Sequence, residues 1–211
     1  MKHIIKGAEP TKFAEWKALA NAEWQPTYSA LRSEEKAAVK TALMEEQGYI
    51  CCYCECKLDN EDSHIEHIIP QSEDSRAALD FSNMACSCQK PKNKGIPLHC
   101  GNKKGNWYED NSFVSPLDPD CEQCFAFTDD GHIHPAEHRN EAARETISRL
   151  SLDIPKLVAL REAAMAPFQD ESLTPDEVQE FAIKYLERTS QGTFNEFWTT
   201  IKYLFARDVA V

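Results

Sequence analysis

The stretch of sequence that decides the fold is His64-Ile65-Glu66-His67-Ile68-Ile69-Pro70. Its three isoleucines among polar residues, followed by the proline, predict a strand that ends before Pro70. Strict alternation would place Glu66 and His67 on opposite faces of this strand. The two side chains can share one site only if the strand ends irregularly, and the proline makes such an ending reasonable.

The segments on either side have helical patterns. Residues 11–47 predict two helices, with Ser33 as the N-cap of the second and Gly48 as its stop. Tyr49-Ile50-Cys51 is a further strand candidate. After residue 135 the pattern predicts two helices broken near residues 153–155, a helix with a capping box at residues 174–177, and a last helix over residues 195–206. We therefore expect an α+β chain with a helical extension at 1–48, a core at 49–134 and a helical region at 135–211.

Most of the nine cysteines lie between residues 51 and 100. Cys51 and Cys54 have the C-x2-C spacing that lets two thiolates hold one tetrahedral metal ion from a tight turn. Cys88 and Cys100 complete four ligands around an excursion of the chain, which predicts a structural Zn²⁺ site with no open position. The sequence leaves Cys52, Cys56, Cys86 and His99 as alternative ligands. It also leaves open that these cysteines are small core residues or free thiols.

The histidines and carboxylate of the deciding stretch suit phosphodiester hydrolysis. A neutral imidazole can deprotonate water near pH 7, and a hard divalent ion on oxygen ligands stabilises the charge that develops on the phosphate. His64 is a second candidate for the base or for a metal ligand, or it is only a polar neighbour on the strand. A zinc-binding module without catalysis is the alternative for the whole group.

The order of these residues resembles the HNH, or ββα-metal, nuclease pattern. That pattern has an acidic residue and a histidine at a strand end, an asparagine five residues before a cysteine, and a second cysteine that opens a helix with a polar ligand and a lysine. The resemblance implies that His67 is the general base, that Glu66 and Asn102 bind Mg²⁺ or Mn²⁺, and that Asn83 orients the base. Asn102 departs from the pattern by one place, because Gly101 stands where the helix ligand commonly lies.

Residues 48–134 are also similar to PtuB, the nuclease subunit of Septu antiphage systems, and to related retron proteins. The shared features are the stretches at residues 50–55, 64–70, 83–84, 99–105 and 116–121, with Asp130-Gly131 after them. This resemblance implies an ABC/SMC-like ATPase partner of the PtuA type, an association with retron components and a role in phage defence.

A second C-x2-C pair, Cys121 and Cys124, is followed by His132 and His134, and Asp-Asp-Gly at residues 129–131 indicates a hairpin turn. These four side chains are candidates for a second zinc site. The alternative is a surface loop that contains two cysteines by chance.

The net charge of −12 is unusual for a nucleic-acid-binding protein, because binding to phosphate favours basic surfaces. Residues 81–108 nevertheless contain no acidic residue and a stripe of five lysines, which is either a binding surface or a solvated loop: Lys90, Lys92, Lys94, Lys103 and Lys104. A partner protein could supply further phosphate contacts. No signal peptide or apolar run long enough for a membrane span is evident, so we expect a cytoplasmic protein.

These observations predict a metal-dependent endonuclease that cleaves DNA as the effector of an ATPase–nuclease defence complex. Cleavage of RNA, for example tRNA, is the alternative within the same fold, since the motif alone does not distinguish the two nucleic acids. The alternative outside nucleases is a zinc module that binds nucleic acid or protein without cleaving it.

Overall fold

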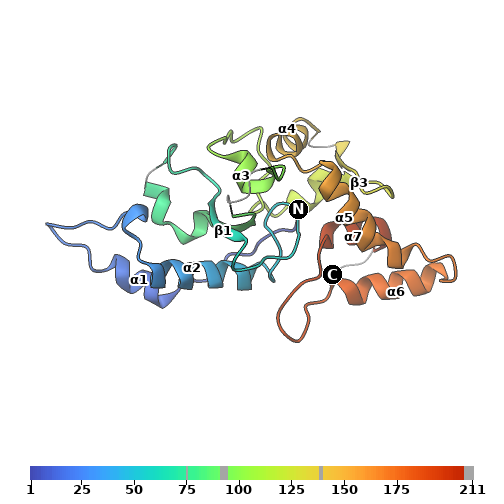
Figure 1. Cartoon of the computed structure of the whole chain (residues 1–211), viewed down its shortest axis with the longest axis horizontal. Coiled ribbons are helices and arrows are strands. Elements are labelled where there is room, and N and C mark those ends of the chain that lie inside the picture. Colours follow the sequence, from blue (N-terminus) through green and yellow to red (C-terminus); the bar gives the residue numbers. More distant parts are fainter. Residues whose placement is uncertain (75, 91–94, 138–139, 207–211) are drawn as a thin grey trace.

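A computed structural model describes residues 1–74, 76–90, 95–137 and 140–206 of the chain. Figure 1 shows helices α1 (Thr11–Lys17) and α2 (Ser33–Glu46) at one end of the molecule and α6 (Pro175–Leu186) at the other. Strand β1 (Ser63–His67) and helix α3 (Cys100–Lys104) lie between these ends. The expected mixture of helices with little sheet is thus confirmed.

The N-terminal helices pack against each other and, through α2, against the central strands. Val39 and Leu43 are four residues apart in α2, so both face the core, where they are fully buried. The prediction that Ser33 is the N-cap was wrong by one residue: Arg32 holds that position without a side-chain cap, and its guanidinium pairs with Glu35 instead. Gly48 follows the helix with a φ of +61°, as the predicted stop requires. A short 3-10 helix, η1 (Tyr28–Ala30), lies between α1 and α2.

The central segment contains two antiparallel strands, β1 and β2 (Met84–Cys88), with Ser63 opposite Cys88 and His67 opposite Met84. The 3-10 helices η2 (Arg76–Leu79) and η3 (Phe81–Asn83) connect the strands, and α3 packs against β2. The expected strand at residues 49–51 is not formed, since this segment makes only one isolated bridge, between Ile50 and Lys57. Tyr49 has a φ of +62°, which is incompatible with extended backbone.

A second antiparallel pair follows, β3 (Phe125–Phe127) and β4 (Ile133–Pro135), after the 3-10 helix η4 (Cys121–Cys124). The predicted turn at residues 129–131 is confirmed, and Gly131 has the positive φ of +81° that favours glycine. Its backbone also lies where a Cβ would collide with the carbonyl oxygen of Val158.

The C-terminal region consists of α4 (Asn140–Leu150), α5 (Pro155–Met165), η6 (Ala166–Phe168), α6 and α7 (Trp198–Phe205). The break between α4 and α5 falls where the sequence predicts it. The predicted capping box of α6 is also present, with Thr174 and Glu177 each accepting a hydrogen bond from the other's backbone. Helix α7 begins three residues later than expected, because Phe197 adopts the left-handed conformation with a φ of +52°.

One hydrophobic core joins residues from all three expected segments, including Phe13, Leu43, Met84 and Leu150. A smaller core lies among the C-terminal helices and includes Phe168 and Ile201. The boundaries at residues 48 and 134 therefore separate sequence patterns that pack together, and their status as domain boundaries stays a prediction. None of the helices in the described part of the chain has the length and apolar character needed to cross a bilayer.

Candidate metal-dependent active site

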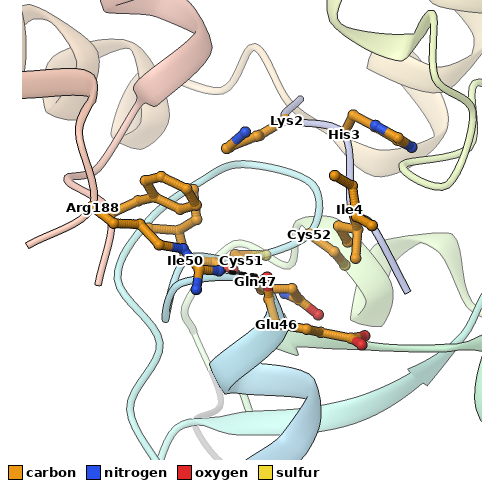
Figure 2. A pocket seen from close by; sticks show the side chains of 11 residues that line it. Lys2, His3, Ile4, Glu46, Gln47, Ile50, Cys51, Cys52 and Arg188 are labelled. Carbon is orange, nitrogen blue, oxygen red and sulfur yellow. Dashed lines mark hydrogen bonds between the residues drawn. The ribbon is translucent and has the colours of Figure 1, made fainter. Parts of the chain in front are cut away.

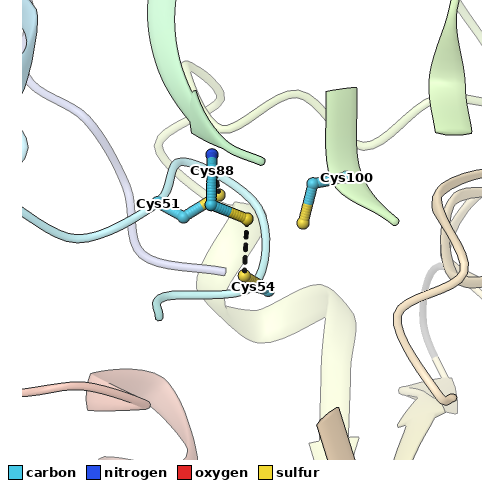
Figure 3. Close-up of side chains that lie close together, drawn as sticks. All are labelled: Cys51, Cys54, Cys88 and Cys100. Atoms are coloured by element: carbon cyan, nitrogen blue, oxygen red, sulfur yellow. Dashed lines mark hydrogen bonds between the residues drawn. The ribbon is translucent and has the colours of Figure 1, made fainter. Parts of the chain in front are cut away.

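The four predicted zinc ligands come together from three places in the chain. Cys51 and Cys54 lie in the turn after α2, Cys88 is the last residue of β2, and Cys100 is the first residue of α3 (Figure 3). Their sulfur atoms all lie within 4.8 Å of one another, and all four residues are buried. Hydrogen bonds with Cys100 and neighbouring thiols lower the pKa of Cys54, which favours the thiolate that binds metal. The group could therefore hold a metal ion.

The alternative cysteines lie outside this group. Cys52 and Cys86 are buried, and Cys56 is half-buried. His99 also lies next to the group, since its Nδ1 is 3.1 Å from the sulfur of Cys100 and 3.8 Å from that of Cys88. An N–H group at this distance could donate to a thiolate of the cluster.

The side chains of His64 and Glu66 lie on the same face of β1, as a spacing of two residues requires. The His64 Nε2 atom is 3.5 Å from Glu66 Oε2. The other carboxylate oxygen, Oε1, accepts a hydrogen bond from the buried Tyr53 hydroxyl at 3.0 Å and lies 3.1 Å from the Lys104 ammonium. Burial alone would raise the pKa of Glu66, but the neighbouring His64 ring and the Lys104 charge hold it below its usual value. Glu66 is therefore a carboxylate near pH 7.

Gly101, the residue that stands at the usual position of the helix ligand, faces this pair directly. A Cβ at Gly101 would collide with Glu66 Oε2 and would lie 2.8 Å from His64 Nε2. The absence of a side chain on this turn of α3 is thus what lets His64 and Glu66 approach the helix.

The His67 ring lies on the other face of the strand, as alternation predicts. Its Nε2 donates to the Ala78 carbonyl at 3.1 Å, and its Nδ1 accepts from the exposed Gln71 amide at 3.3 Å. The ring also packs edge-on against Tyr28, with 4.6 Å between centroids. Because Nε2 holds the proton, the lone pair lies on Nδ1. Burial lowers the pKa of His67, so the imidazole is neutral near pH 7.

Lys104 connects the two faces at the end of β1. Its fully buried ammonium lies 3.1 Å from Glu66 Oε1 and donates to the His67 carbonyl oxygen at 3.1 Å. Apart from Lys104, the two residues have different partners: Tyr53 and His64 for Glu66, and Ala78 and Gln71 for His67. The meeting of these two side chains around one ion stays a prediction.

Asn83 binds the backbone of the segment that follows His67. The structure records no contact between the Asn83 side chain and the His67 ring. Its Oδ1 accepts from the Ile69 N–H at 2.8 Å, and its Nδ2 donates to the Ile69 carbonyl at 2.9 Å and to the Ala77 carbonyl at 3.2 Å. These bonds fix the residue before Ala78, whose carbonyl in turn accepts from His67 Nε2.

The Asn102 side chain points to a backbone carbonyl. Its Nδ2 donates a short hydrogen bond to the Gln89 oxygen, the same oxygen that accepts from His64 Nδ1 at 2.9 Å. Gln89 has a φ of +62°, and its own side chain bonds His99 and Pro97. Sequence reasoning did not find Tyr53, Gln89 or the role of Gly101. Only Tyr53 carried a local signal, since it lies inside the C-x2-C turn.

Three comparisons with known sequences bear on this site. A protein proposed to be the HNH endonuclease of retron Vc95 from Vibrio cholerae serotype O1 biovar El Tor is 33% identical over 130 residues. The Septu protein PtuB from Bacillus thuringiensis is 27% identical over 107 residues. A protein proposed to be the HNH endonuclease of retron Ec83 from Escherichia coli is 30% identical over 132 residues. The chain is a relative of these HNH proteins.

The matches to these HNH relatives are partial. They cover 58%, 50% and 56% of the chain and 60%, 37% and 51% of the relatives' own lengths, in the order given. No family model matches the chain. The predicted resemblance to HNH proteins is therefore confirmed over about half of the sequence.

The predicted second metal site does not form among the described residues. The Cys121 thiol donates to the Met1 carbonyl at 3.5 Å, and His132 pairs with Asp153 at 2.9 Å. Cys124 is buried, whereas His134 is exposed. Among the described residues, the side chains that lie close enough to share a metal ion are those of the cluster with Cys51, and these four are not among them. Cys121 and Cys124 are the first and last residues of η4, and both are part of the hydrophobic core.

The predicted lysine stripe is only partly present. Lys104 is buried, so its charge is used inside the site and not on the surface, while Lys103 is exposed and Lys90 is half-buried. Lys92 and Lys94 lie outside the described residues. A cavity of about 360 Å³ is lined in part by Cys51 and Cys52 (Figure 2). None of the predicted catalytic residues is among the residues that line it.

Proposed function

We propose that this chain is a metal-dependent endonuclease with a ββα-metal centre formed by β1, β2 and α3. The observation that carries the proposal is the end of β1, where a buried carboxylate, Glu66, and a neutral imidazole, His67, follow each other next to helix α3. The names of the two retron relatives support the same reaction class.

The four-cysteine cluster binds Zn²⁺ in this proposal. Four thiolates suit zinc, and they close its coordination shell, so the ion is structural. It ties the 51–54 turn, the end of β2 and the start of α3 together, and these are the segments that hold Tyr53, Gln89 and Gly101 against the strand.

His67 acts as the general base. Its Nε2–H bond to Ala78 leaves Nδ1 free to take a proton from water once the exposed Gln71 amide moves away. Asn83 keeps the loop that contains Ala78 in place, so it acts through that loop and not on the substrate.

Glu66 is the carboxylate ligand of a divalent ion, Mg²⁺ or Mn²⁺, and Asn102 is the helix ligand that the resemblance implies. The carboxylate fits this role, because Lys104 and Tyr53 approach its Oε1 while its Oε2 faces His64. Such an ion would stabilise the charge on the phosphate and on the leaving oxygen. The fit of Asn102 is poorer, since its amide nitrogen is bound to the Gln89 carbonyl.

The substrate that we favour is DNA, and the partner is an ABC/SMC-like ATPase. The support for both is the similarity to PtuB and to the retron proteins, together with the net charge of −12, which leaves phosphate binding to be completed by a partner. We propose that the chain is the nuclease subunit of a defence complex in the cytoplasm.

The test is a cleavage assay with zinc-loaded protein, with and without a candidate ABC/SMC-like ATPase, on plasmid DNA and on tRNA with Mg²⁺ or Mn²⁺. We expect plasmid cleavage that EDTA abolishes and that His67→Ala lowers at least 100-fold, since general bases contribute about 10²–10⁴-fold. His134→Ala is the matched control, because His134 is exposed on β4 outside this site.

If the protein cleaved tRNA and left plasmid DNA intact, its substrate would be RNA. Retarded migration of nucleic acid without cleavage, unchanged by His67→Ala, would instead support a binding module and refute the nuclease.

A further inference from the structure

The proposed catalytic ion lacks a well-oriented second ligand from helix α3. Gly101 has no side chain, and the Asn102 amide nitrogen donates to the Gln89 carbonyl. A divalent ion held by Glu66 alone would be weakly bound. A second ligand must come from another protein atom near Glu66 Oε2 that is free to bind a cation.

We infer that His64 Nε2 is this second ligand, and that with Glu66 Oε2 it forms a mixed nitrogen–oxygen site for a transition-metal ion. The inference rests on the proposed function for the presence of the ion. It changes the site in two respects: the ligand comes from the strand instead of the helix, and the imidazole disfavours Mg²⁺.

The separation of the two atoms allows one ion to bind both. Metal–ligand bonds to nitrogen and oxygen measure about 2.0–2.3 Å, so two of them can span the 3.5 Å between His64 Nε2 and Glu66 Oε2. Gly101 lies against both atoms, and any side chain there would fill the space next to them.

The orientation of the His64 ring also fits a ligand. Its Nδ1–H donates to the Gln89 carbonyl at 2.9 Å, which leaves the lone pair on Nε2. Histidines that bind metal usually donate their other N–H to a carboxylate or backbone carbonyl in this way, because the bond fixes the tautomer and the ring angle. A histidine that served only as a polar surface residue would not need this partner.

The two carboxylate oxygens of Glu66 have separate partners. Tyr53 and Lys104 both bind Oε1, and Oε2 faces His64. The Lys104 cation is therefore bound to the oxygen that the proposed ion does not use. The His64 side chain is 23% exposed and that of Glu66 is 9% exposed, so the pair is open to solvent on the histidine side, where a phosphate could complete the coordination.

The ligand set indicates the kind of ion. Imidazole nitrogen favours transition metals, whereas Mg²⁺ prefers oxygen ligands and water. Mn²⁺ binds most weakly among the divalent first-row transition metals, but it is still a transition-metal ion. We therefore expect the site to bind Mn²⁺ more tightly than Mg²⁺.

The experiment measures Mn²⁺ binding to the full zinc-loaded chain without nucleic acid, by electron paramagnetic resonance. We expect His64→Ala to weaken Mn²⁺ binding at least 10-fold, the scale on which changes at metal-bound histidines act. Pulsed measurements should detect a ¹⁴N coupling from a directly bound imidazole, and His64→Ala should abolish it. His64→Asp should restore binding without the ¹⁴N signal and should let Mg²⁺ compete better.

His67→Ala and Asn102→Ala are the controls, and both should keep the ¹⁴N signal. Zinc content and circular dichroism establish that each variant is folded, and His64→Gln replaces His64→Ala if the latter is not. Mn²⁺ bound without a ¹⁴N signal, or a signal lost in His67→Ala and kept in His64→Ala, would overturn the inference. Because no substrate is present, a protein that has the signal but cleaves nothing would refute the nuclease and leave the ligand assignment standing.

Discussion

At the scale of single residues, Gly101 shows how tertiary contacts reverse a local preference. In a helix, alanine is favoured over glycine by about 1 kcal/mol, so α3 taken alone would be more stable with Ala at this position. The structure opposes that gain, because the added Cβ would collide with Glu66 Oε2 and approach His64 Nε2. The glycine is required by the carboxylate and the imidazole that face it.

We expect Gly101→Ala to destabilise the zinc-loaded protein by about 1–3 kcal/mol, the usual cost of overpacking, and to lower cleavage at least 10-fold. Denaturant unfolding and the plasmid assay measure the two effects. Gly7→Ala is the control, since the nearest atom to its Cβ would be Glu46 Oε2 at an ordinary 3.7 Å. A Gly101→Ala protein that is more stable than the original would contradict the steric argument.

At the scale of elements, Asp153 joins the β3–β4 hairpin to the turn between α4 and α5. Its Oδ1 accepts from the Ile133 N–H at 3.0 Å, and its Oδ2 accepts from His132 Nδ1 at 2.9 Å. The hydrogen bond and the charge of Asp153 raise the pKa of His132. The histidine that the sequence offers as a metal ligand therefore connects two elements instead.

The expected result of an NMR titration is a His132 pKa above about 6.5, which falls towards that value in Asp153→Asn. Because the folded pKa is raised, the ion pair stabilises the fold below the unfolded pKa, and its contribution disappears as pH rises through the folded pKa. Asp129→Asn removes a nearby exposed carboxylate as the control. If Asp153→Asn left the His132 titration unchanged, the pair would not explain the shift.

At the scale of the whole molecule, the cysteine cluster joins the segments that surround the candidate site. The 51–54 turn follows α2, and Cys100 begins α3, which packs against α4. β1 and β2 form a sheet of two strands, and a two-stranded sheet is marginally stable without further support. If the cluster holds a metal ion as proposed, we expect metal binding and folding to be coupled in this region.

Metal analysis should find about one tightly bound zinc per chain, since four thiolates bind one ion. Cys54→Ser should lose the zinc and the cooperative unfolding transition, whereas Cys56→Ser, which alters a half-buried thiol outside the cluster, should keep both. Circular dichroism during thermal unfolding checks the prediction. A Cys54→Ser protein that folds cooperatively without zinc would show that the cluster is not the metal site that supports the fold.

The sequence alone determined the features that depend on spacing along the chain. The C-x2-C turn, the strand before Pro70, the capping box at Thr174 and the hairpin at Gly131 follow from local geometry, which few distant contacts can override. The tertiary structure decided what each side chain meets. Residues 66, 89 and 101 surround His64, and the buried Lys104 ammonium pairs with Glu66. These contacts form because β2 and α3 bring the positions together across long loops. Spacing fixes the face on which a side chain lies, but packing fixes its partner.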